Sequence, residues 1–250
     1  MPFTPAHPAI ILPFIRSRYF SATGLIAGSM SPDFEYFFKM SVSSVYSHTV
    51  AGLFYFDLPV TILIALVFHL IVKKNLIYNL PLFLQKKFQA LLEFDFVKYL
   101  KEHVWIFVIS GLLGAASHIL WDSFTHNNSF FAQTLPVYKS VHVPFDGVRY
   151  PLFYALQHIS TAVGLTVVLI YILSMRSWPV HSYSKQKFLY WFTLASIAMV
   201  ITWVRFLIRP LGTDIGNLIV SIISGLLLAF VCCGLINFKR TNIAEESRNG

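Results

Sequence analysis

The chain has 250 residues, of which 56% are hydrophobic and 12% are charged, and its mean hydropathy is +0.65. Soluble domains carry about 25% charged residues, so this composition excludes an ordinary soluble protein and indicates a membrane protein. The formal net charge of +8 is explained by loop lysines and contact with anionic lipid, and the sequence carries no nucleic-acid-binding motif. The length suits a single membrane domain over residues 1–250.

The N-terminal region, residues 1–50, contains two apolar stretches that are each too short to span a bilayer. Residues 9–15 and 19–30 are separated by Arg16 and Arg18, whereas a spanning helix needs roughly 20 apolar residues. We expect a re-entrant or interfacial helical segment here, which is tolerated where protein or water covers its backbone.

Five later segments are apolar enough to cross a bilayer. The chain is therefore predicted to be an all-α integral membrane helical bundle with about five transmembrane helices, at residues 51–72, 104–121, 152–175, 188–208 and 217–238. Between the first two spans, residues 73–103 favour an amphipathic connection on the membrane surface. Residues 127–151 are predicted to be irregular, and the polar tail 239–250 to be mobile.

The distribution of basic residues predicts the orientation of the chain. Most lysines and arginines lie in residues 73–103, in residues 176–187 and in the C-terminal tail, which five spans place on one side. The positive-inside rule makes this side cytoplasmic. We therefore expect a multi-pass protein of the bacterial cytoplasmic (inner) membrane, with its N-terminal region on the outer face.

Six metal-ligand residues from separate segments are expected at this outer boundary: His7, Asp33, His48, His118, Asp122 and His126. The last three lie four residues apart, so a helix would place them along one stripe. Imidazole and carboxylate groups at that spacing can bind one divalent cation, and zinc suits a His/Asp set best. We expect four more polar residues near the same outer boundary of the membrane: Gln157, His158, Arg205 and Arg209.

Each of these residues also fits a purely structural role. Asp33 and His48 could cap helices, and His126 could belong to a turn. Arg205 and Arg209 are typical of snorkelling anchors at a membrane surface. The joint occurrence of His118, Asp122 and His126 favours metal binding or catalysis over these roles.

Long motifs at these positions resemble a family of bacterial multi-pass membrane proteins known as domain of unknown function 4184. The resemblance rests on residues 1–9, 28–36, 47–49, 117–126 and 157–158. It implies a membrane fold and supplies no activity.

A more distant resemblance links the order of these residues to membrane-bound metal-dependent hydrolases and to zinc-dependent phospholipase C. It implies that one metal is held by Asp33, His48, His118 and Asp122. It also implies that Asp122 reaches a second metal beside His7, whereas His126 departs from the spacing of the later ligands.

The expected function is a metal-dependent hydrolase that acts on a phospholipid or a lipid-linked ester at the membrane surface. Asp122 and Glu35 are the candidate catalytic residues, and a metal would activate water for attack. We expect Arg205 and Arg209 to steady an anionic headgroup, and Gln157 and His158 to face the substrate. The expected partners are therefore membrane lipids.

Two other functions stay open from the sequence alone, as do enzymatic activity itself and the oligomeric state. One is a transporter or ion-binding membrane protein, although transport sites usually lie near the midplane, where this chain has few ionisable groups. The other is a non-catalytic scaffold in which the polar cluster locks helices together.

Overall fold

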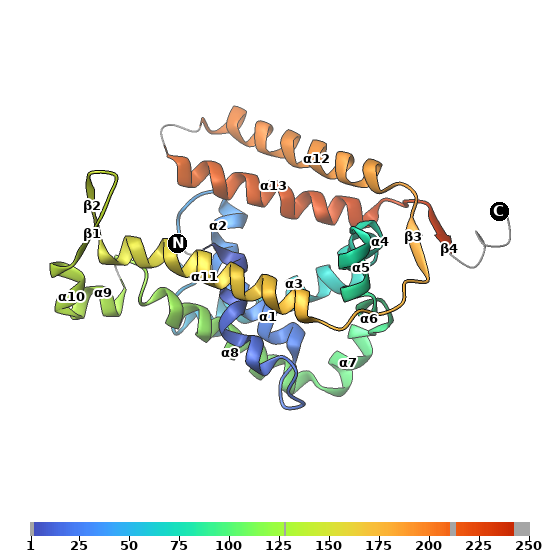
Figure 1. Ribbon diagram of the computed structural model, residues 1–250, viewed down its shortest axis with the longest axis horizontal. Coiled ribbons are helices and arrows are strands. Elements are labelled where there is room, and N and C mark those ends of the chain that lie inside the picture. Colours follow the sequence, from blue (N-terminus) through green and yellow to red (C-terminus); the bar gives the residue numbers. More distant parts are fainter. Residues whose placement is uncertain (1–2, 128, 211–213, 243–250) are drawn as a thin grey trace. The chain divides into compact units, whose positions relative to one another are not determined.

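The computed structural model describes residues 3–127, 129–210 and 214–242 (Figure 1). These residues form two compact units. The first unit comprises Met1–Phe34, Val45–Ile62 and Glu102–Ser174, and the second comprises Glu35–Ser44, Leu63–Lys101 and Met175–Gly250.

Among the described residues, five helices are long and apolar enough to cross a membrane: Leu53–Asn79, Val104–Asp122, Leu152–Ser174, Lys187–Ile208 and Ile215–Leu235. They confirm the expected all-α membrane fold. The first of them runs seven residues beyond the expected end at residue 72, because Lys73–Asn79 continues the helix as α4. It also contains two π-helical turns, η3 (Leu53–Asp57) and η4 (Phe68–Val72), around α3 (Leu58–Val67).

In the first unit, a 3-10 helix and a short α-helix replace the two apolar N-terminal stretches. The 3-10 helix η1 (Thr4–Phe14) contains Pro8 and Pro13, which cannot donate the hydrogen bonds of a regular α-helix. Helix α1 (Ala22–Met30) begins after Ser21, whose side chain accepts a hydrogen bond from the Gly24 amide, and the 3-10 turn η2 (Ser31–Asp33) follows it. Neither segment reaches spanning length, as the sequence predicts.

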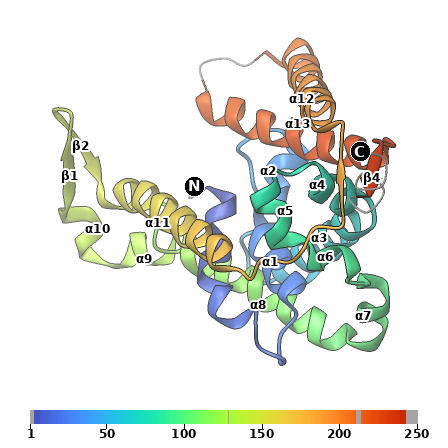
Figure 2. The ribbon, with the colours of Figure 1, turned by 45° about the vertical axis from the view of Figure 1, so that its right-hand side comes forward.

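Helix α1 packs against α8 (Val104–Asp122), and the two lie side by side in both views (Figure 1, Figure 2). Glycines allow the two backbones to touch: a Cβ on Gly28 would lie 3.0 Å from the Cα of Gly111, and one on Gly114 would lie 2.8 Å from the Ser29 amide nitrogen. Such close approach between small residues is typical of membrane helix pairs. It fixes the end of α1 against the middle of α8, one to two turns before His118.

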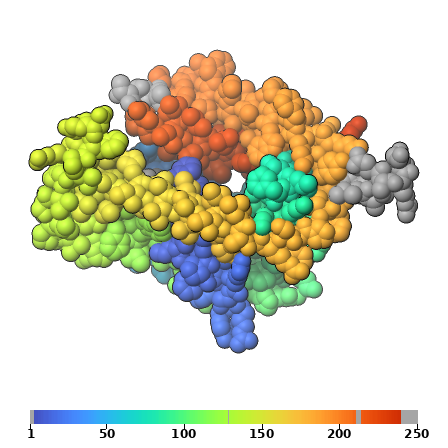
Figure 3. Space-filling view, in the orientation of Figure 1, coloured from blue at the N-terminus to red at the C-terminus, as the bar shows by residue number. Residues whose placement is uncertain are grey.

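Helix α11 (Leu152–Ser174) completes the first unit by packing on η1. Gly164 meets Ala6, and the Phe3 amide donates to the Thr161 hydroxyl at 3.0 Å. The rest of α11 is at least partly exposed along the surface that Figure 3 shows.

The prediction that residues 127–151 are irregular is wrong. The described residues of this segment form α9 (Phe130–Thr134), α10 (Pro136–Ser140) and a hairpin of β1 (His142–Phe145) and β2 (Val148–Pro151). Asp146 and Gly147 make the turn with φ of 49° and 75°. Positive φ at both positions is the requirement of a type I′ hairpin, for which Asp-Gly is a strong signal.

The second unit is centred on the pair α12 (Lys187–Ile208) and α13 (Ile215–Leu235). Its buried core comprises Tyr190, Leu194, Ala198, Ala229, Cys233 and Phe238. The Asn75 amide in α4 donates to three carbonyls at the end of α13, those of Cys233, Gly234 and Ile236, at 2.8–3.0 Å. These bonds satisfy groups that a helix terminus leaves unpaired.

The remaining elements of the second unit are short. They are α2 (Phe34–Lys39), α5 (Leu82–Phe88), α6 (Ala90–Glu93), α7 (Phe96–Glu102), and the paired strands β3 (Ser182–Ser184) and β4 (Arg240–Asn242). Residues 73–103, where an amphipathic connection is expected, thus form α4 followed by the three short helices α5, α6 and α7. In the predicted mobile tail 239–250, residues 240–242 form β4 and residues 243–250 lie outside the described part of the chain.

Candidate metal centre

Three segments of the first unit deliver four acidic and imidazole side chains to one place. The last turns of α8 present His118 and Asp122, and the turn η2 presents Asp33. His48 comes from the loop before η3 and adopts a φ of 59°. A positive φ is uncommon for a residue with a side chain, and such conformations concentrate at functional sites.

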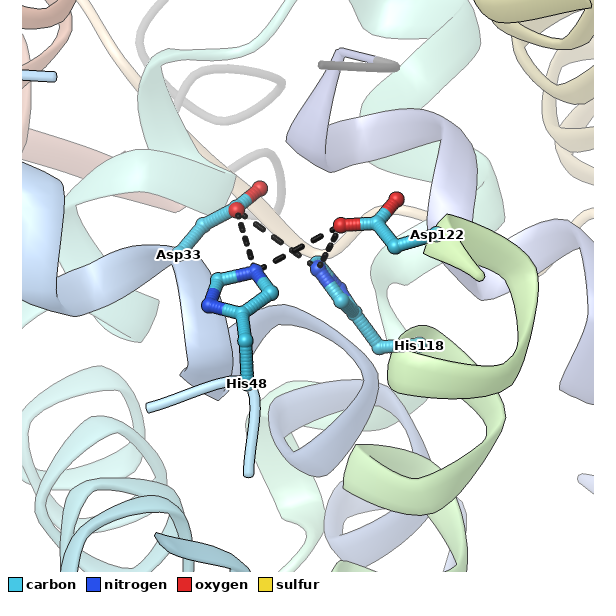
Figure 4. Close-up of side chains that lie close together, drawn as sticks. All are labelled: Asp33, His48, His118 and Asp122. Carbon is cyan, nitrogen blue, oxygen red and sulfur yellow. Dashed lines mark ion pairs between the residues drawn. The ribbon is translucent and has the colours of Figure 1, made fainter. Parts of the chain in front are cut away.

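One atom from each of these four residues forms a compact cluster, with all four atoms within 4.8 Å of one another. Figure 4 shows the four side chains pointing toward a common centre. The Asp33 Oδ1 lies 3.6 Å from His48 Nε2 and 3.5 Å from His118 Nε2. The Asp122 Oδ2 lies 3.4 Å and 3.3 Å from the same two nitrogens.

These separations fit a bound metal ion. Around a tetrahedral zinc ion with bonds of about 2.0–2.2 Å, neighbouring ligand atoms are about 3.3–3.6 Å apart. Within the described part of the chain, Asp33 Oδ1, His118 Nε2 and Asp122 Oδ2 are also buried without a hydrogen-bond partner. Buried polar atoms are normally paired, because leaving them unpaired costs free energy. A shared cation would satisfy all three.

Hydrogen bonds around the cluster direct its nitrogen and oxygen atoms inward. The His118 Nδ1 donates to the Ser29 carbonyl at 2.8 Å, which leaves Nε2 as the acceptor that faces the two aspartates. The Thr4 hydroxyl donates to Asp33 Oδ2, the oxygen that points away from the cluster. Contacts of this kind fix the tautomer and orientation of metal ligands.

The other oxygen of Asp122 faces two more histidines. Asp122 Oδ1 lies 3.1 Å from His7 Nε2 and 3.6 Å from His126 Nδ1. The His7 ring stacks on the His118 ring with their centroids 3.6 Å apart. The His126 Nδ1 donates to the Asp122 backbone carbonyl at 3.1 Å. His7 and His126 therefore lie beside the four-residue cluster and contact its outer edge.

The cluster is buried on one side and reachable from the other. The side chains of His118 and Asp33 have no exposed surface, whereas His48 and His126 expose 19% and 29%. Small molecules would thus approach past His48 and His126.

The surroundings shift the pKa values of the loop residues in the cluster. Burial would raise the pKa of Asp33, but the neighbouring His118 and His48 lower it by more, and the net pKa lies well below the ordinary value. Burial lowers the pKa of His48, but the nearby carboxylates of Asp122 and Asp33 raise it by more, so the net pKa lies above its usual value. For His126, burial dominates and lowers the pKa.

The other predicted site residues lie outside this cluster. Gln157 and His158 are on α11 of the first unit, where the His158 ring packs edge-on against Tyr154 at 4.6 Å. Glu35, Arg205 and Arg209 belong to the second unit. The roles assigned to these five residues stay predictions.

Glu35 has local partners in the second unit. It forms an ion pair with Lys39, and its other carboxylate oxygen accepts a hydrogen bond from the Ser44 hydroxyl at 3.0 Å.

Sequence reasoning missed the groups that orient the cluster, namely the Thr4 hydroxyl and the Ser29 carbonyl. A backbone carbonyl has no sequence signature of its own. The spacing Gly24-x-x-x-Gly28, however, is a known signal of close helix packing, and it could have indicated that another helix touches this end of α1.

Comparisons with known proteins place the chain in a family without assigning an activity. No curated protein and no solved structure matches the chain. The family described as "Domain of unknown function (DUF4184)" matches residues 1–235, in agreement with the resemblance of the motifs. The chain, which has five helices of membrane-spanning length, therefore belongs to this family.

Proposed function

We propose that the protein is a membrane-embedded, metal-dependent hydrolase that acts on a phospholipid or a lipid-linked ester. The observation that carries the proposal is the convergence of Asp33, His48, His118 and Asp122, whose ligand atoms have the spacing of a metal shell. Three of these atoms are buried and have no hydrogen-bond partner among the described residues.

Zinc is the metal that best suits this donor set. Magnesium and calcium prefer sites made of oxygen atoms alone, whereas zinc accepts imidazole nitrogen and carboxylate oxygen together. Bound there, a zinc ion would supply Lewis-acid activation of water and of an ester or phosphoryl oxygen.

The residues around the cluster support distinct roles in hydrolysis. Thr4 and the Ser29 carbonyl hold Asp33 and His118 in their orientations. His126 suits a proton acceptor, because its lowered pKa favours the neutral imidazole and, among residues 3–127, 129–210 and 214–242, its Nε2 has no hydrogen-bond partner. His7 contacts Asp122 and supports the orientation of that carboxylate.

The surroundings of the open side favour a lipid substrate. His48 is flanked by exposed apolar residues, Tyr46 and Val50, and the nearby helix start exposes Phe54 and Tyr55. Aromatic residues of this kind are typical of the boundary between lipid and water. A substrate whose ester lies at headgroup depth would reach the cluster from this boundary.

We further propose that the site faces the outside of the bacterial cytoplasmic membrane. The proposal rests on the excess of basic residues in segments 73–103 and 176–187 and in the C-terminal tail. Reactivity of a cysteine introduced at Val50 with an impermeant maleimide in intact cells tests this orientation, and labelling only after lysis would contradict it.

The hydrolase proposal is tested with purified protein in phospholipid vesicles of phosphatidylglycerol and phosphatidylethanolamine. We expect zinc-dependent release of a fatty acid or a phosphorylated headgroup, which a chelator abolishes. The variants His118→Ala and Asp122→Asn should lose at least about a thousandfold in rate. The matched variants His142→Ala and Asp146→Asn should retain it, because these exposed hairpin residues share the spacing but not the site. Zinc binding without hydrolysis of either lipid would contradict the proposal.

A further inference from the structure

The second unit contains a groove of about 650 Å³ between the end of α2 and the last turns of α12. Phe38, Lys39 and Met40 line one wall. The other wall is a face of α12 that is apolar along most of its length and cationic at its end. The groove lies wholly within this unit.

The apolar part of the groove includes a stripe of exposed side chains along which a lipid acyl chain could lie. Val200, Val204 and Ile208 are exposed and four residues apart, so they form one stripe along the helix. The stripe is about 12 Å long, because each helical residue rises about 1.5 Å. This length is most of the hydrocarbon depth of one leaflet, about 15 Å.

The cationic end of the groove is held in place by the backbone. The Arg205 guanidinium donates to the Arg209 carbonyl at 2.6 Å and to the Met40 carbonyl at 3.1 Å. These bonds fix its charge beside the exposed side chain of Arg209. Neither arginine forms an ion pair with an acidic residue in the described part of the chain, whereas Lys39 is paired with Glu35.

We propose that this groove binds one anionic phospholipid, with an acyl chain along the valine–isoleucine stripe and the phosphate at Arg205 and Arg209. A chain that spans a membrane meets such lipids at high concentration. Two cations without carboxylate partners favour a headgroup with net negative charge over a zwitterionic one. The site needs neither the metal centre nor hydrolysis, so it stands apart from the proposed function.

The competing explanation is that the arginines only close the end of α12 and reach toward water. Arg205 does bind carbonyls at this helix end, as a capping residue would. Selectivity between lipids separates the two explanations, because capping and snorkelling do not distinguish phosphatidylglycerol from phosphatidylcholine.

The test is native mass spectrometry of the full chain, released from detergent, with phosphatidylglycerol or phosphatidylcholine added at equal concentration. We expect wild type to bind phosphatidylglycerol at least about tenfold more tightly, and Arg205→Gln/Arg209→Gln to lose this preference. The double variant Arg16→Gln/Arg18→Gln is the matched control and should keep it, because both arginines lie in the first unit.

Two single variants keep the test decisive if the double variant does not fold. Arg209→Gln keeps the carbonyl that Arg205 binds and should lower phosphatidylglycerol affinity about threefold or more. Val204→Trp fills the groove without changing charge and should weaken both lipids. Equal affinity of wild type for the two lipids would overturn the proposal, as would unchanged phosphatidylglycerol binding in folded Arg209→Gln and Val204→Trp.

Discussion

The substitution Gly28→Ala tests whether the contact between α1 and α8 sets the geometry of the metal centre. A methyl group on residue 28 would lie 2.9 Å from the carbonyl carbon of Gly111 and 3.0 Å from its Cα, whereas ordinary contacts begin at 3.4 Å. The helices must therefore separate by about 0.5 Å or more, and overpacking of this kind costs about 1–3 kcal/mol.

This displacement reaches the cluster directly. Ser29, the next residue, provides the carbonyl that orients His118, and Asp33 follows one turn later. Metal ligands tolerate displacements of only about 0.2 Å. We therefore expect zinc affinity to fall about 10- to 100-fold, the usual effect of disturbing the contacts that orient ligands.

The assay is competition for zinc with a chromophoric chelator, together with a thermal melt of the same preparation. Gly225→Ala is the matched control, because its methyl group would lie 2.7 Å from Thr202 Oγ1 and 2.9 Å from the Ala198 carbonyl, within the second unit. The control should lower the melting temperature without changing zinc affinity. A folded Gly28→Ala protein with the zinc affinity of wild type would refute the reasoning.

Three further substitutions or conditions probe the residues around the cluster. Zinc affinity should fall as pH is lowered from about 8 to 6, because the carboxylates of two aspartates raise the pKa of His48 against the effect of burial, and zinc must displace the proton that this imidazole retains. Isothermal titration across this range checks the prediction, and a flat profile would contradict it. Thr4→Val removes the hydroxyl that orients Asp33 and should weaken zinc binding about tenfold, whereas Thr4→Ser should restore it. His126→Gln should lower the rate of hydrolysis about 10²-fold or more with zinc content unchanged; loss of zinc would instead identify His126 as a ligand.

Much of the fold was predictable from the sequence because bilayer thickness imposes a simple rule on length and hydropathy. The five spans follow from runs of apolar residues. Residues 127–151 were harder to predict, because Pro136, Pro144 and Gly147 are typical of irregular segments, whereas Asp146-Gly147 is also the turn that pairs the strands around it. The same two residues are thus compatible with a loop or a hairpin, and the pairing of the flanking strands selects the hairpin.

The candidate site was partly predictable for a different reason. Successive spans cross a membrane in opposite directions, so the start of the first span and the end of the second lie at the same boundary. This rule predicts that His48, His118 and Asp122 share a boundary, and the structure places them in one cluster with Asp33. The unusual backbone of His48 and the carbonyl that orients His118 depend on tertiary packing, which residue types do not encode locally. The sequence likewise does not show that Asp122 Oδ2 faces the four-residue cluster whereas Asp122 Oδ1 faces His7.

The central claim is that Asp33, His48, His118 and Asp122 hold one divalent metal ion. Elemental analysis of the purified protein after exposure to zinc and removal of the excess tests it most directly, with wild type compared with Asp33→Asn, His118→Ala and the control Asp146→Asn. We predict about one equivalent of tightly bound zinc in wild type and in the control, and loss of that equivalent in the two cluster variants. Zinc retained in folded Asp33→Asn and His118→Ala proteins, or absent from wild type, would contradict the account.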